Sequence, residues 1–307
     1  MPPRLPLTPL FTPCRLRLPL SQLRTNTTLG TSAHGSVINI QQIPAPGAGH
    51  IRVLLLNRPE ARNALSRQLL ESLSKHINAV SAEQGKGPTR ALVVASNVDA
   101  AFCAGADLKE RTGFTREETE TFLSNLRQTF ASLAALQIPT ISAISSVALG
   151  GGLELALCTN LRVFSSSAMV GLPETRLAII PGAGGTYRLP GLIGMNRALD
   201  MILTGRRVSG PEAYFMGLCN RLVEVTPEEA AQSGAAREKV LQQSIKLALD
   251  ICEGGPIALR QALQAVRGFE GGESVENEAY LGVVETEDRF EALKAFAEKR
   301  KPYFKGR

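Results

Sequence analysis

The chain has 307 residues, of which 44% are hydrophobic and 20% are charged. This composition is typical of a folded globular protein, and the length allows one large domain or two of ordinary size. No apolar run approaches the roughly 20 residues of a membrane span, so we expect no transmembrane helix.

The first 34 residues carry much of the net charge of +6 and contain no acidic residue. Removing their four arginines from that total leaves only +2, which does not indicate a nucleic-acid partner. The segment is rich in Ser, Thr, Leu and Pro, which favours a mitochondrial transit peptide over residues 1–34. A disordered basic tail is the alternative, because prolines disfavour the amphipathic helix typical of such peptides.

Four short, mainly apolar runs predict strands, at residues 51–56, 91–95, 141–144 and 161–164, and the first two are expected to be buried. Between them, Ser66 is expected to cap a helix that runs to about Ser81. Thr115 followed by Glu118 is the pattern of a capping box and predicts a second helix that ends near Leu136. This alternation of strand and helix predicts an α/β fold with largely parallel strands.

Strand signals stop at Thr226, and four helices are predicted beyond it, over residues 227–251, 256–266, 274–286 and 287–300. Such a helical end without a closed pattern of its own often packs on other subunits, so we expect an oligomer. The five cysteines and three histidines show no disulfide or zinc spacing, and we predict no metal site.

One glycine-rich stretch places a carboxylate at the start of a helix. Leu149, Leu153, Ala156 and Leu157 recur at helical spacing, which puts three glycines (150–152) at the helix start, followed by Glu154. The first N–H groups of a helix have no partner within it, and glycine lets a ligand oxygen approach them closely. The alternative is that the glycines only pack the helix on a neighbour.

Two further segments carry comparable features. Residues 102–110 follow a strand and surround Ala106 with small residues, although Asp107 there is equally typical of a helix cap. Residues 171–186 supply a second carboxylate, Glu174, directly after Pro173 and before another glycine-rich turn. The alternative for Glu174 is an ordinary acidic residue in the first turn of a helix.

Together, residues 102–109, 149–157 and 172–186 resemble the signatures of the crotonase, or enoyl-CoA hydratase, superfamily. The resemblance extends over residues 36–307 and is strongest to its AU-binding methylglutaconyl-CoA hydratase branch. It implies an α/β fold, a crotonase-like spiral of β-β-α turns over residues 35–240, and a helical trimerisation region over residues 241–307. The resemblance implies an assembly of identical subunits, either a trimer or a dimer of trimers. The second of these is a homohexamer.

The resemblance also implies roles for individual residues. The backbone N–H groups of Ala106 and Gly151 match the family's oxyanion hole, which polarises the thioester carbonyl. Glu154 and Glu174 match the two glutamates of the hydratases. We assign Glu154 to activation of water and Glu174 to proton transfer at C2.

The CoA part of the substrate is expected to contact two loops, one over residues 62–64 after the first predicted strand and one over residues 104–109. No separate cofactor is implied. In this resemblance the contacting residues are Arg62, Ala104, Ala106, Asp107, Leu108, Lys109 and Gly151. A basic residue of the tail is expected to reach the ligand of a neighbouring subunit. We assign that role to Lys299, with Arg300 and Lys301 as alternatives.

The predicted function is an enoyl-CoA hydratase of the mitochondrial matrix that acts on a short or branched acyl chain, such as 3-methylglutaconyl-CoA in leucine degradation. A short-chain enoyl-CoA hydratase of fatty acid β-oxidation is the alternative, since Ser145-Ser146-Val147 stand where the family has Asn-Gly and leave the acyl preference open. RNA binding is an alternative of another class. The helix over residues 66–81 offers only Arg67 and Lys75 for it, so we expect no RNA partner.

Overall fold

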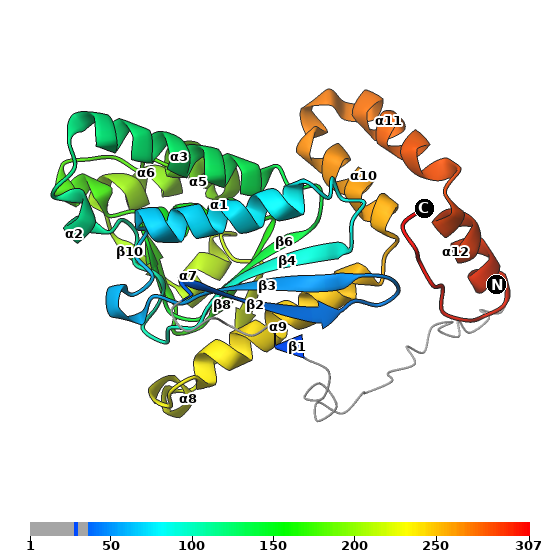
Figure 1. The fold of residues 1–307 in the computed structure, drawn as a ribbon, viewed down its shortest axis with the longest axis horizontal. Helices are drawn as coiled ribbons and strands as arrows, with labels where there is room; N and C mark the ends of the chain where they lie inside the picture. Colours follow the sequence, from blue (N-terminus) through cyan, green and yellow to red (C-terminus); the bar gives the residue numbers. More distant parts are fainter. Residues whose placement is uncertain (1–27, 30–35) are drawn as a thin grey trace, which may run out of the picture.

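The computed structural model of the protein describes residues 28–29 and 36–307 (Figure 1). The predicted transit peptide therefore lies outside the described residues, apart from the backbone of β1 (Thr28–Leu29), which pairs antiparallel with β2 (Ile38–Pro44). Within the described part of the chain, no helix is long and apolar enough to cross a membrane.

A seven-stranded sheet forms the centre of the fold, in the order β1-β2-β3-β4-β6-β8-β11. The strands from β3 onward run parallel: β3 (His50–Leu56), β4 (Thr89–Ser96), β6 (Thr140–Ile144), β8 (Leu161–Ser165) and β11 (Arg221–Val223). Helices α1 (Arg67–Ser81) and α3 (Arg116–Ala134) cover one face, and α9 (Ala235–Cys252) covers the other. Burial on both faces explains why these strands are mainly apolar along their length.

A second, four-stranded sheet was not predicted from the sequence. Its parallel strands are β5 (Ala101–Cys103), β7 (Val147–Leu149) and β9 (Met169–Gly171), and β10 (Arg207–Ser209) pairs antiparallel with β9. Each parallel strand follows a strand of the large sheet and precedes a helical segment. The chain thus repeats the order strand, strand, helix, and this confirms the predicted spiral of β-β-α turns.

The two predicted helix starts are confirmed. The hydroxyl of Ser66 accepts a hydrogen bond from the Leu69 N–H at 3.2 Å at the start of α1. At the start of α3, Thr115 and Glu118 form both hydrogen bonds of a capping box, at 2.8 and 3.1 Å.

The helix predicted over residues 227–251 is wrong in one respect, because the structure has two helices there. They are α8 (Pro227–Ala231) and α9, and the break between them contains Gly234 at φ 81°. The Gly234 N–H donates to the Asp99 carboxylate at 3.0 Å, which fixes the chain in this turn.

The last three helices, α10 (Pro256–Arg267), α11 (Gly272–Val284) and α12 (Glu287–Ala297), project away from the sheets as an arm (Figure 1). Large apolar side chains are exposed on this arm, and the exposed fraction of Phe296 reaches 85%. The predicted boundary between residues 240 and 241 falls inside α9, whereas the arm begins only at α10.

Gly152 allows α4 (Gly151–Leu157) to lie against β5, and we predict that Gly152→Ala destabilises the protein. A Cβ at this position would lie 2.2 Å from the Cys103 carbonyl oxygen, which is too close for any real contact. Overpacking of this kind costs about 1–3 kcal/mol or more, and each kcal/mol lowers the Tm of a chain this long by about 2–4 °C.

Thermal unfolding of Gly152→Ala and Gly191→Ala measures this effect. A Cβ at Gly191, in α5 (Gly185–Ile193), meets no atom within 4 Å, so this control should keep or slightly raise the Tm. Equal Tm values for the two variants would contradict the proposed packing.

Candidate active site

The three segments selected from the sequence follow the carboxyl ends of three neighbouring parallel strands. β5 leads to Ala106, β7 leads to Gly151 at the start of α4, and β9 leads to Glu174 in η3 (Glu174–Leu177). Ligands of α/β proteins bind outside the carboxyl ends of such strands. The fold therefore carries the four residues predicted as catalytic to one edge of the small sheet.

The N–H groups of Ala106 and Gly151 lie close together and are free. Leu65 bonds the residues on either side of Ala106, through its N–H to Gly105 at 2.8 Å and its carbonyl to Asp107 at 3.3 Å. A Cβ at Gly105, which has φ 98°, would lie 3.6 Å from the Gly151 nitrogen. Among the described residues, neither N–H donates a hydrogen bond, so both are available to a ligand oxygen.

Glu154 is almost fully buried in α4, with 2% of its surface exposed. One carboxylate oxygen, Oε1, accepts hydrogen bonds from the N–H groups of Ala183 and Gly185, both at 2.8 Å. The turn between these donors contains Gly184 at φ 112°. The other oxygen, Oε2, lies 4.0 Å from where a Cβ of Gly151 would be.

Glu174 is half-buried and faces the start of α4. Its Oε1 would lie 3.0 Å from a Cβ at Gly150, so the glycine leaves room for this carboxyl group. Its Oε2 is enclosed and has no hydrogen-bond partner among the described residues. A buried carboxyl oxygen without a donor favours the protonated form of the group.

Burial acts on both glutamates, but their surroundings separate them. It raises the pKa of Glu154, and the hydrogen bonds from Gly185 and Ala183 act against that rise. The pKa of Glu174 is raised to about 7, first by burial and then by the neighbouring charge of Glu154. Glu154 is thus the better hydrogen-bonded carboxylate, and Glu174 is the group that can hold a proton near neutral pH.

Four residues that contribute to this site do not follow from the sequence. The donors Ala183 and Gly185 lie in the second glycine-rich turn, whose N–H groups no sequence pattern marks as ligands of a carboxylate. Arg111 and Arg188 both act electrostatically on Glu154. Because they come from separate segments of the chain, only the tertiary structure shows that they surround one carboxylate.

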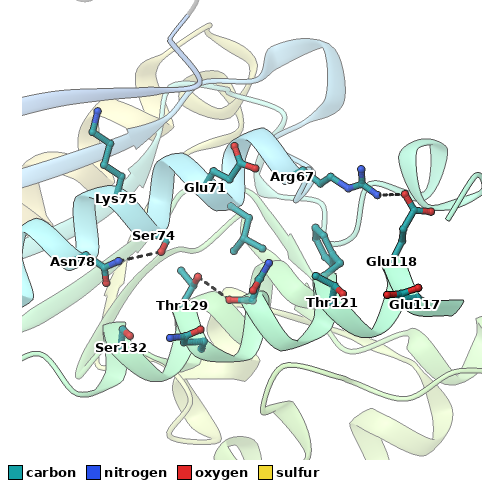
Figure 2. Close-up of a pocket in the computed structure, with 14 residues that line it drawn as sticks. Arg67, Glu71, Ser74, Lys75, Asn78, Glu117, Glu118, Thr121, Thr129 and Ser132 are labelled. Carbon is teal, nitrogen blue, oxygen red and sulfur yellow. Dashed lines mark hydrogen bonds and ion pairs between the residues drawn. The ribbon is translucent and has the colours of Figure 1, made fainter. Parts of the chain in front are cut away.

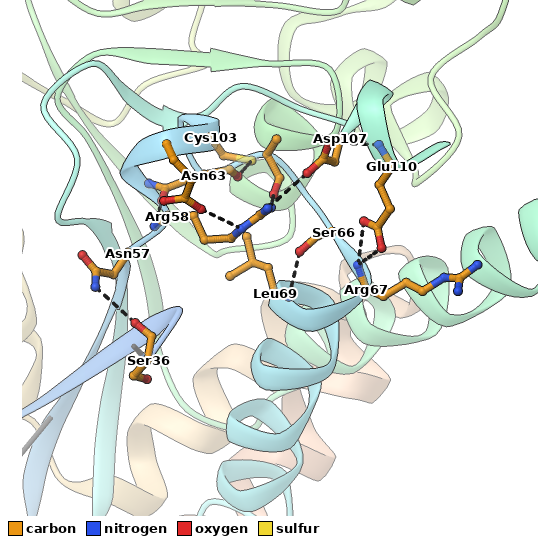
Figure 3. A network of polar contacts seen from close by, with 12 residues as sticks. Ser36, Asn57, Arg58, Asn63, Ser66, Arg67, Leu69, Cys103, Asp107 and Glu110 are labelled. Carbon is orange, nitrogen blue, oxygen red and sulfur yellow. Dashed lines mark hydrogen bonds and ion pairs between the residues drawn. The ribbon is translucent and has the colours of Figure 1, made fainter. Parts of the chain in front are cut away.

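The two loops predicted to contact CoA are joined by a polar network (Figure 3). The Ala104 N–H donates to the Arg62 carbonyl at 3.0 Å, and the buried Asn63 amide donates to the Phe102 carbonyl at 3.0 Å. Arg58 forms an ion pair with Asp107 at 3.2 Å. Asp107 also caps α2 (Leu108–Arg111), as the alternative interpretation had it.

The predicted tail residue is not part of this site within one chain. Lys299 follows α12, and Figure 1 places that helix at the opposite end of the molecule from α2. A contact between Lys299 and a ligand therefore requires a neighbouring subunit, as the sequence interpretation assumed.

A polar groove of about 830 Å³ lies between α1 and α3 (Figure 2), and it contains none of the residues predicted as catalytic. Arg67 and Lys75 line it, but so do Glu71, Glu117 and Glu118, and Arg67 pairs with Glu118 at 2.9 Å. This mixture of charges is not the basic stripe that RNA binding requires.

The unusual approach to α4 still leads into a paired strand. Val147, which follows the two serines, pairs with Ala101 of β5 and with Met169 of β9. The pairing with β9 is regular, whereas the register with β5 shifts between Ala101 and Cys103. The hydroxyls of Ser145 and Ser146 are enclosed without a hydrogen-bond partner among the described residues.

Comparisons with known proteins find relatives of the chain among enzymes that act on CoA thioesters. A family model described as enoyl-CoA hydratase/isomerase matches residues 47–307. The chain is 58% identical to methylglutaconyl-CoA hydratase 1, mitochondrial, of Pyricularia oryzae, over 88% of this chain and 87% of that protein. It is 42% identical to the mitochondrial methylglutaconyl-CoA hydratase of Homo sapiens, over 83% of this chain and 74% of that protein. A crystal structure of enoyl-CoA hydratase from Bacillus anthracis is 40% identical, covers 89% of this chain and 100% of its own, and has a TM-score of 0.80.

The raised pKa of Glu174 predicts a pH-dependent effect of Glu174→Gln on stability. Because the pKa of Glu174 is higher in the folded protein than in the unfolded chain, ionisation of this group lowers the free energy of unfolding. The loss begins above the pKa of the unfolded chain and is complete once the pH exceeds about 7. The neutral glutamine avoids this loss, so Tm should rise by roughly 2–5 °C at pH 8 and by less at pH 5. Glu71→Gln, at an exposed position of α1, is the control, and a gain that does not grow with pH would contradict the prediction.

Proposed function

The chain belongs to the enoyl-CoA hydratase/isomerase family, and we propose that it hydrates 3-methylglutaconyl-CoA. Hydratase activity on enoyl-CoA thioesters is the function of its similar relatives. The observation that carries the proposal is the pairing of two buried or half-buried glutamates with two free N–H groups. This set supplies an acid, a base and an oxyanion hole at one sheet edge.

In the proposed mechanism, the thioester oxygen accepts hydrogen bonds from the N–H groups of Ala106 and Gly151. These donors stabilise the negative charge that forms on that oxygen when water adds to the double bond. One such donor is typically worth about 3 kcal/mol in the transition state. Because both belong to the backbone, their positions depend on the packing of β5 and α4 and not on side-chain rotamers.

The two glutamates divide the proton transfers. With Oε1 held by Ala183 and Gly185, Glu154 uses Oε2 to accept a proton from water. The water oxygen bonds to C3, and the π electrons move onto the thioester oxygen. Glu174, whose pKa is about 7, then donates its proton to C2 as the enolate collapses.

The names of the relatives support the substrate and the location. Two similar proteins are called mitochondrial methylglutaconyl-CoA hydratases, which fits a place in leucine degradation. The basic, acid-free residues 1–34 fit import into the mitochondrial matrix. The exposed apolar side chains of α10–α12 support a homo-oligomer, as a trimer or a dimer of trimers.

Substitution of either glutamate should remove most of the hydratase activity. We expect Glu154→Gln and Glu174→Gln each to lower kcat by at least about 100-fold, because glutamine keeps the shape but cannot exchange protons. Loss of the enoyl thioester absorbance measures turnover, and the exposed Glu71→Gln should retain it. Wild-type turnover in both active-site variants would rule out the mechanism.

A panel of enoyl-CoA thioesters tests the substrate. We expect kcat/KM to be at least about tenfold higher for 3-methylglutaconyl-CoA than for crotonyl-CoA, a difference of about 1.4 kcal/mol in transition-state binding. A strong preference for crotonyl-CoA would instead assign the protein to short-chain fatty acid β-oxidation.

A further inference from the structure

Arg111 is a half-buried cation without a hydrogen-bonding or ion-pair partner in the part of the chain that the structure describes. Among the described residues, its guanidinium makes no hydrogen bond and no ion pair, and its Nε is enclosed without an acceptor. The group stacks on the ring of Phe122 in α3, 4.5 Å from the ring centroid. A buried charged donor without an acceptor is unfavourable, so this arrangement calls for a partner from outside the chain.

A neighbouring arginine also stacks on a phenylalanine ring, but its guanidinium has an ion-pair partner. Arg67 stacks on Phe114 at 4.3 Å, and the rings of Phe114 and Phe122 lie 5.9 Å apart. Unlike Arg111, Arg67 pairs with Glu118 at 2.9 Å and keeps 48% of its side chain exposed. The two arginines thus flank one pair of rings, and only Arg67 has an acidic partner.

Arg111 lies next to the catalytic groups. It is the last residue of α2, which begins directly after Asp107. The loop of residues 104–107, which we call the oxyanion loop, carries the free N–H of Ala106. The pKa of Arg111 is lowered by burial, and the charges of Glu110, Glu154 and Asp107 act against that change. Helix α3 reaches the same place, since Arg127 donates to the Gly182 carbonyl at 2.7 Å, beside the turn that holds Glu154.

We infer that Arg111 binds the carboxylate at the far end of the acyl chain and so selects dicarboxylic enoyl thioesters. The inference rests on the proposed function, because 3-methylglutaconyl-CoA carries such a carboxylate two carbons beyond C3. With the thioester oxygen at Ala106 and Gly151 and C3 beside Glu154, this carboxylate approaches two glutamates. Without a cation, like charges would repel it.

The geometry favours Arg111 over Arg188 for this role. The Nη1 of Arg188 already donates to the Ala183 carbonyl at 3.0 Å, and its guanidinium stacks on the exposed Tyr187 at 4.7 Å. In Arg111 only Nε is fully enclosed, so the two terminal nitrogens remain open to a ligand. A planar guanidinium binds a carboxylate with two parallel hydrogen bonds, which a lysine cannot reproduce.

Paired substrates that differ only at the far end of the acyl chain test this inference. We would compare kcat/KM for 3-methylglutaconyl-CoA with that for 3-methylpent-2-enoyl-CoA, in which a methyl group replaces the carboxylate. Arg111→Met should lose at least about 30-fold on the acidic substrate, mainly through KM, and change less than about threefold on the neutral one. Arg111→Lys should fall between wild type and Arg111→Met.

Binding without turnover gives a second readout. Glutaryl-CoA should inhibit Arg111→Met more weakly than wild type, whereas its neutral counterpart pentanoyl-CoA should inhibit both equally. Arg67→Met is the matched control and should behave as wild type with every compound, because it removes a stacked arginine from the outer side of the same ring pair.

The outcomes separate this inference from the proposed function. If wild type prefers the acidic substrate and Arg111→Met keeps that preference, the inference is wrong and the function stands. Equal losses on both substrates would also overturn it, since they would show that Arg111 only supports the fold. If wild type itself prefers the neutral substrate, the proposed substrate is wrong.

Discussion

The close approach of α4 to the end of β5 is the constraint on which the active site depends. Gly152 lies so near the Cys103 carbonyl that no side chain fits between them. This contact brings the first turn of α4 beside the oxyanion loop, where Gly105 in turn lies against the Leu149 carbonyl. The glycines were open to two interpretations, packing or ligand binding. The structure gives packing to Gly152 and leaves the N–H of Gly151 free, so packing is what makes binding possible.

The second constraint is electrostatic, because one small site holds two carboxyl groups. The fold gives them unequal surroundings: Glu154 receives two N–H groups from a glycine-rich turn, whereas the enclosed oxygen of Glu174 receives none. Two neighbouring carboxyl groups cannot both be ionised without cost, so the carboxylate with more hydrogen-bond donors keeps the charge and the other keeps the proton. The same backbone that closes the turn therefore also sets the protonation of both groups.

Local patterns predicted those parts of the protein whose causes are local. The caps at Ser66 and Thr115 need only residues within one turn, and the long buried strands need only a continuous aliphatic run. The second sheet was not predicted because β5, β7 and β9 have three residues each, which is too few for a strand pattern. Family motifs indicated the four positions that are predicted to be catalytic. The donors to Glu154 and the place of Arg111 depend on contacts between distant segments, such as α2 with α3, and no local pattern encodes them.

Chemistry and selectivity rest on different parts of this fold. The N–H donors and both glutamates follow strands of one sheet, so their geometry is fixed by strand register and by glycine contacts. Arg111 instead ends a single-turn helix, which is held by the Asp107 cap and by stacking on Phe122. Substitutions in α2 can therefore alter what lies beyond C3 without moving the groups proposed to act at C2 and C3. The segment after β5 thus serves both purposes, with Ala106 at the sheet edge and Arg111 one helical turn further on, where the sheet does not constrain the chain.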